Sequence, residues 1–149
     1  MENQAINLKP IQIVHLAMCI APALFLAIVF VLNKNDFNAA IFGDDVLYFI
    51  TPAMAAGAFI TGHMLFKKHL SAIDKDMSLS ERLTKYQSAF IIRQALIEGA
   101  TIFNIVAYFL LGHSFFAAIA LILILLMFAF RPTKFRVSED LQLNYTDLN

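Results

Sequence analysis

One glutamate, Glu98, stands inside a long apolar stretch of the sequence, and His63 and His15 stand inside two other apolar stretches. A carboxylate held away from water must be paired, protonated or used for function, because leaving it charged and alone is costly. One carboxylate and two imidazoles could bind a proton or a cation, or could join neighbouring helices through hydrogen bonds or an ion pair. With the adjacent Arg93 and Gln94, these residues form the candidate polar cluster.

Other kinds of chemistry have less support in the sequence. Two histidines and a carboxylate also suit a facial metal site, but no His-Glu-x-x-His run is present, so no metal is expected. No cysteine or serine has a base arranged beside it, and no glycine-rich phosphate loop occurs, which indicates neither an enzyme nor a bound cofactor. A net charge of zero without a basic stripe argues against nucleic-acid binding.

Composition indicates what must position this cluster. Of 149 residues, 60% are hydrophobic and only 15% are charged, which is far from the average of a soluble domain. The apolar residues fall into four runs, at 13–32, 46–66, 89–111 and 115–130. About twenty helical residues cross the roughly 30 Å hydrocarbon core of a bilayer. The sequence therefore predicts an all-α polytopic membrane protein with four transmembrane helices in one domain, 1–149.

Between the second and third runs lies a polar segment, 67–88. Ser78 and Glu81 fit a capping box, and nothing after them except Gly99 weakens a helix as far as Leu111. Such a helix would be about 50 Å long, which exceeds the bilayer thickness. We therefore expect the second and third helices to extend beyond the membrane as a charged hairpin.

Lysine and arginine residues are distributed unevenly around the four runs. Nine lie on the side that holds both termini and the 67–88 segment, whereas Lys34 alone lies on the other side. By the positive-inside rule, this predicts a multi-pass protein of the inner (plasma) membrane with both termini in the cytoplasm. The acidic outer loop includes Asp44 and Asp45, either of which could cap the second helix.

Counting residues inward from the cytoplasmic ends places Glu98, His63 and His15 in one layer, roughly 6–8 Å deep. Arg93 lies about 140° from Glu98 around the same helix, so a partner for Glu98 should come from another helix. His63 is the first choice and His15 and Arg131 are the others. Small residues of the second helix, spaced as Ala53-x-x-x-Gly57 and Ala58-x-x-x-Gly62, would allow the close approach.

Two local resemblances concern the third apolar run. The segment Ala95-Leu96-Ile97-Glu98-Gly99-Ala100-Thr101-Ile102-Phe103 resembles the carboxylate-bearing helix of the proteolipid (rotor) subunits of rotary ATP synthases, over about ten residues. The longer stretch 93–112, with its Glu-Gly core and a tyrosine before Gly112, is similar to small four-helix bacterial membrane proteins without assigned activity. This second resemblance covers the last two runs and implies no catalytic residues.

Two functions remain open from the sequence. The first is an accessory or interaction subunit that lies in the lipid bilayer and forms a homo-oligomer or binds other membrane protein subunits. The alternative is a small proton or cation carrier that uses Glu98.

Overall fold

The computed structural model describes residues 7–33 and 45–143. It is all-α, and the helices in these ranges are α1 Lys9–Leu32, α2 Leu47–Ser71, α3 Leu79–Leu111, α4 Ser114–Ala129 and α5 Lys134–Asp140. The first three are long and apolar enough to cross a membrane. A fourth crossing requires α4 and α5 to be taken together, although they are bent by 81° at the break between them. Lys34, Asp36 and Asp44 of the expected outer loop lie outside the described residues.

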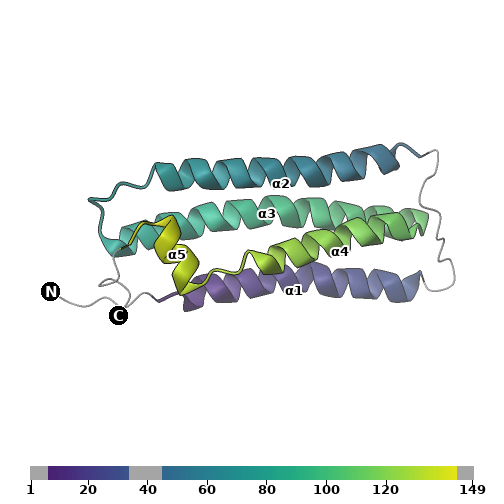
Figure 1. The fold of residues 1–149 in the computed structure, drawn as a ribbon. Coiled ribbons are helices and arrows are strands. Elements are labelled where there is room, and N and C mark those ends of the chain that lie inside the picture. Colours follow the sequence, from purple (N-terminus) through teal and green to yellow (C-terminus); the bar gives the residue numbers. More distant parts are fainter. Residues whose placement is uncertain (1–6, 34–44, 144–149) are drawn as a thin grey trace.

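Helix α3 is the central element of the bundle. It packs against α1, α2 and α4, whereas α2 packs mainly on α3 (Figure 1). Accordingly, 44% of the most apolar 18-residue stretch of α3 is buried, whereas the corresponding stretches of α1 and α2 are each 22% buried. A side chain on α3 can therefore face one of three neighbours, and its position around the helix decides which.

The ends of α3 follow the sequence closely. The Ser78 side chain accepts a hydrogen bond from the Glu81 N–H, and the Glu81 carboxylate accepts from the Ser78 N–H, which confirms the predicted capping box. At the other end Gly112 has φ 69°, and its N–H donates to the Tyr108 carbonyl at 2.9 Å. Glycine adopts this left-handed conformation without a Cβ penalty. The result is one unbroken helix of 33 residues.

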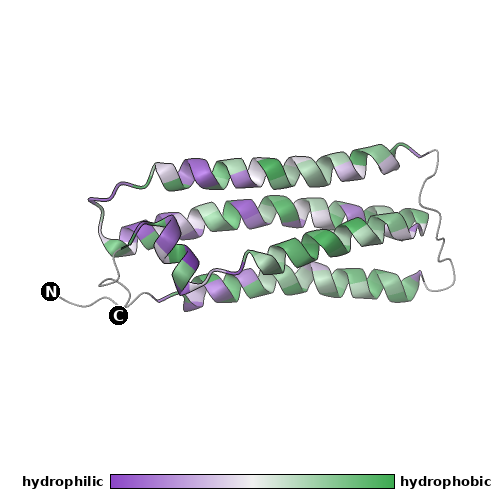
Figure 2. Ribbon diagram, in the orientation of Figure 1, coloured by the Kyte–Doolittle hydropathy of each residue, from purple (hydrophilic) through white to green (hydrophobic). Residues whose placement is uncertain are grey.

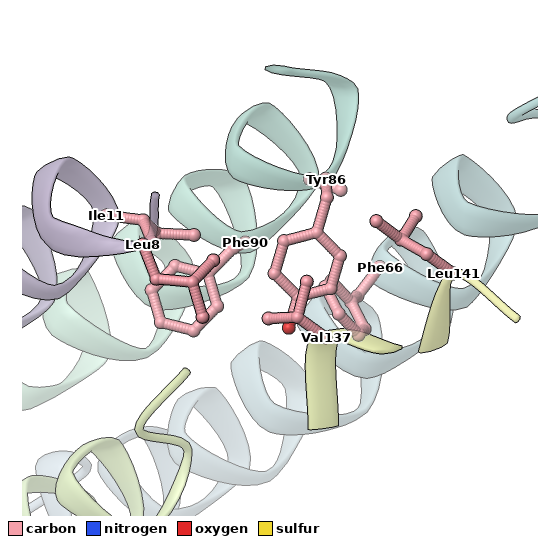
Figure 3. Close-up of a cluster of buried hydrophobic side chains, with 8 residues drawn as sticks. Leu8, Ile11, Phe66, Tyr86, Phe90, Val137 and Leu141 are labelled. Atoms are coloured by element: carbon pink, nitrogen blue, oxygen red, sulfur yellow. The ribbon is translucent and has the colours of Figure 1, made fainter. Parts of the chain in front are cut away.

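Polar residues gather at one end of the bundle, where α5 and the α2–α3 connection lie (Figure 2). Beneath them is a cluster of buried side chains, in which the Tyr86 ring lies close to Phe66, Phe90 and Val137 (Figure 3). The cluster joins the start of α1, the C-terminal part of α2, the N-terminal part of α3, and α5. This end, which we call the polar end, is therefore held by packing between α1, α2, α3 and α5.

The expected tail after the fourth run contains a further helix. Thr133 caps α5 by accepting from the Arg136 N–H at 3.3 Å, and Arg82 of α3 donates to the Leu141 carbonyl just after it. Val137 and Leu141, one turn apart, are buried against the bundle. Thus α5 lies across the polar end as a short amphipathic helix.

Candidate functional site

Two of the predicted cluster residues form a buried pair between α1 and α3. The Gln94 Nε2 atom is 2.8 Å from His15 Nδ1 and 3.3 Å from the Met127 carbonyl oxygen of α4. Gln94 has no exposed surface and His15 is 4% exposed. A single amide group therefore links three helices.

Gln94 is the polar link between α1 and α4. A backbone carbonyl can only accept, so the Gln94 amide nitrogen donates to Met127. The Cys19 sulfur lies 3.8 Å from both His15 ring nitrogens, and Cys19 is fully buried.

Arg93 lies about 100° around α3 from Gln94 and is only 6% exposed. Its guanidinium carbon is 3.9 Å from the ring centroid of Phe66, 4.4 Å from that of Phe130 and 5.3 Å from that of Phe90. Aromatic faces stabilise a cation, and three of them surround this one. Among the described residues no carboxylate lies within ion-pairing distance of Arg93. The three rings therefore enclose the guanidinium without an ion pair in that part of the chain.

Gly62 lets α2 come close to Arg93. A Cβ at position 62 would lie 3.4 Å from the Arg93 carbonyl oxygen and 3.5 Å from its Cγ. This part of the predicted small-residue pattern therefore faces α3. By contrast, Ala53 and Gly57 are exposed, and a Cβ added at Gly57 would meet nothing within 4 Å.

His63 lies with Arg93 and not with Glu98. Its ring stacks with Phe59 at 6.5 Å between centroids, and its Nδ1 has no hydrogen-bond partner within the described ranges. His63 and Arg93 both line a cavity of about 360 Å³ between α2, α3 and α5. Its other charged lining residues have mixed signs: Lys67, Arg136, Glu139 and Asp140. Its acidic side chains come from α5, and Tyr86 donates to Asp140 Oδ2 at 3.2 Å.

The predicted contact of Glu98 with a basic or histidine side chain is wrong. Glu98 is half-buried, and its carboxylate has neither a hydrogen bond nor an ion pair with any described residue, including His63, His15 and Arg131. The reason is its position around α3. Glu98 is about 40° from Gln94 but about 140° from Arg93, whereas α2 brings His63 to the Arg93 side.

The surroundings of Glu98 are open. Ala95, Gly99 and Ile102, which flank it on the surface of α3, are exposed, and a Cβ added at Gly99 would meet nothing within 4 Å. The carboxylate thus lies next to exposed, mostly small residues on the outer face of α3. In the described part of the chain no group of three histidine, cysteine or acidic side chains is arranged to hold a metal ion.

The structure therefore divides the predicted cluster into three parts. His15 and Gln94 form one pair, Arg93 and His63 line the mixed-charge cavity, and Glu98 stands apart. The sequence reasoning missed α5 and Asp140, although the spacing of Thr133, Val137 and Leu141 carried a signal of a capped amphipathic helix. The chain matches no protein-family model, and no curated protein or solved structure is significantly similar to it.

Proposed function

We propose that this protein is a non-enzymatic interaction subunit of the plasma membrane, and that the Glu98 face of α3 is where it contacts its partner. A carboxylate in a transmembrane segment is costly unless it is paired. The lack of a partner for Glu98 among the described residues is the observation that carries the proposal. A donor group from another subunit, a second copy or a different membrane protein, would satisfy it.

The small residues around Glu98 also support an interaction face at this position of α3. Gly99 and Ala95 would let the backbone of a foreign helix approach closely, as small residues do where transmembrane helices associate. Within the chain, Gly62 already serves this purpose against Arg93. An equivalent approach at Gly99 needs a helix that this chain does not place there in its described part.

The proposed topology has four spans and two cytoplasmic termini. It rests on the nine-to-one distribution of basic residues, and the gathering of polar residues at one end agrees with it (Figure 2). The test uses a Cys19→Ala background with single cysteines at Asn38 or Ser71; Asn38 lies outside the described residues. Asn38→Cys should react with a membrane-impermeant maleimide in intact cells, and Ser71→Cys only after lysis. The reverse pattern would overturn this orientation.

The interaction role is tested by replacing Glu98 with leucine. Native mass spectrometry from nanodiscs should find the wild-type chain as an oligomer or with a co-purified subunit, and Glu98→Leu should reduce that assembly at least tenfold. Thr61→Leu is the matched control, because it also replaces a polar side chain within an apolar helix, but at an exposed position of α2. A wild-type chain that stays monomeric, or a Glu98→Leu variant that assembles normally, would contradict the proposal.

The carrier is the second candidate, because an unpartnered carboxylate lies one helical turn from the buried His15–Gln94 pair. Proteoliposomes with an internal pH-sensitive dye distinguish the two functions. A carrier should show a proton flux that Glu98→Gln abolishes while assembly is kept. An interaction subunit should show no flux above empty liposomes.

A further inference from the structure

A second cavity of about 390 Å³ lies between the start of α1 and the end of α4. We propose that this groove binds an anionic phospholipid, with the phosphate at Lys9 and Arg131 and one acyl chain along the apolar wall below them. The groove is lined by Lys9, Gln12, Ile13, His15, Leu16, Phe128 and Arg131. None of these lining residues has a hydrogen bond or ion pair with Glu98, so the inference does not depend on the proposed interaction face.

Charge is the first argument. Lys9 and Arg131 are the charged residues that line the groove among the described residues, and no acidic side chain of that part of the chain lines it. Both are exposed, and neither side chain has a hydrogen bond or ion pair with a described residue. Two unpaired cations at the end of an apolar bundle attract anionic lipid headgroups, and basic pockets between transmembrane helices bind such headgroups.

The backbone at the mouth of the groove favours an anion as well. Carbonyl groups at the end of a helix are normally left without partners and repel a phosphate. Here Gln12 Nε2 donates to the Pro132 carbonyl at 3.0 Å, and Arg136 Nη1 donates to the Ala129 carbonyl at 2.5 Å. Two carbonyls near the end of α4 therefore already accept hydrogen bonds from Gln12 and Arg136. The Arg131 side chain is not needed for this and is available to a ligand.

The wall below the cations suits an acyl chain. Ile13, Leu16 and Phe128 line it and are all exposed, and buried His15 closes its inner side. A free phosphate would use only the cations, whereas a phospholipid would also cover these apolar side chains. The cavity beside Arg93 has no such match, because Glu139 and Asp140 place negative charge in its lining.

The test measures lipid retention by the full chain in detergent, using native mass spectrometry with added dioleoyl phosphatidylglycerol or dioleoyl phosphatidylcholine. The wild-type protein should retain phosphatidylglycerol at least tenfold better. Lys9→Gln combined with Arg131→Gln should weaken that retention roughly 10- to 30-fold, since each basic group near an anionic headgroup contributes about fivefold. The matched control is Lys68→Gln combined with Lys134→Gln, which removes the same charge from exposed positions outside the groove and should retain the lipid.

Three results would overturn the proposal. The first is equal retention of the two lipids by the wild-type chain. The second is an equal loss in the control variant, which would indicate a diffuse surface charge and no groove. The third is displacement of the lipid by inorganic phosphate at equal concentration, which would identify a free anion as the ligand. Circular dichroism and thermal melting of both double variants show whether they fold as the wild type does.

Discussion

Arg93 and Glu98 are charged residues on the same helix, five positions apart, but their surroundings in the fold differ. Arg93 is packed among Phe66, Phe90 and Phe130 and buried beneath α2, whereas Glu98 is half-buried and has no hydrogen bond or ion pair with a described residue. The difference teaches that charged residues on one apolar helix can serve two purposes. One that is enclosed stabilises the fold itself, and one that is left open is available to something outside the chain.

The strongest test of this contrast is Arg93→Ala. It removes a large buried side chain together with its cation–π contacts to three rings, so unfolding free energy should fall by about 3 kcal/mol. Arg93→Lys should lose less, because the positive charge remains while the planar stacking is lost. Unfolding by SDS in mixed micelles, followed by circular dichroism, measures both. If Arg93→Ala were no less stable than Glu98→Ala, the enclosed charge would not be structural.

The next test separates the two small-residue positions of α2. Gly62→Leu should push α2 away from the Arg93 backbone and cost about 2 kcal/mol, because a Cβ there already contacts Arg93 at 3.4 Å and the rest of a leucine side chain would extend beyond it. Gly57→Leu is the matched control and should be close to neutral, since a Cβ there meets nothing within 4 Å. Equal losses in the same unfolding assay would show that α2 does not pack on α3 through Gly62.

For substitution of Glu98 we expect the unfolding free energy to rise and not to fall. In the isolated chain in detergent, Glu98→Leu should raise the unfolding free energy by about 1 kcal/mol, because an unpaired polar group leaves an apolar environment. The same substitution should weaken assembly, so stability and interaction would change in opposite directions. A loss of stability in the isolated chain would mean that Glu98 is satisfied within the fold.

The smallest expected effect lies at the capped end of α3, outside the apolar run 89–111. Ser78→Ala should destabilise the first turns by about 1 kcal/mol, seen as faster amide exchange in residues 79–85 with unchanged spans. Exchange that is already fast in the wild-type protein would show that this end is not helical in solution.

The same cap gives a pH dependence. Hydrogen bonds from the Ser78 hydroxyl and N–H hold the pKa of Glu81 below its ordinary value of 4.5. A lowered carboxylate pKa stabilises the folded helix end above pH 4.5, and this contribution is lost as the pH falls through the folded-state pKa. Amide protection of residues 79–85 should therefore decrease in acid, and much less so in Ser78→Ala.

Much of the fold could be predicted because it is encoded locally. Ser78, Glu81 and Gly112 define the ends of α3, and the predicted helix 79–111 is confirmed. Counting residues placed Glu98, His63 and His15 in one layer, with Arg93 and Gln94 close to Glu98 in the sequence. The partner of Glu98 could not be found in this way, because depth does not say which side of α3 each neighbouring helix covers. That choice depends on Gly62 and the three rings around Arg93, which are contacts between distant parts of the chain.

The 81° bend between α4 and α5 has a consequence for the surrounding lipid. Sixteen helical residues of α4 rise about 24 Å, less than the roughly 30 Å hydrocarbon core. Gln12 and Arg136 donate hydrogen bonds to the Pro132 and Ala129 carbonyls near the end of α4. The helix can therefore end early without leaving these carbonyls unpaired in an apolar environment. If α4 crosses the membrane as proposed, the apolar belt of the protein would be lower along α4 than along α1 and α3. Lipids beside α4 would then have to shorten or the molecule would have to tilt, and membrane thickness would affect how this protein sits in the bilayer.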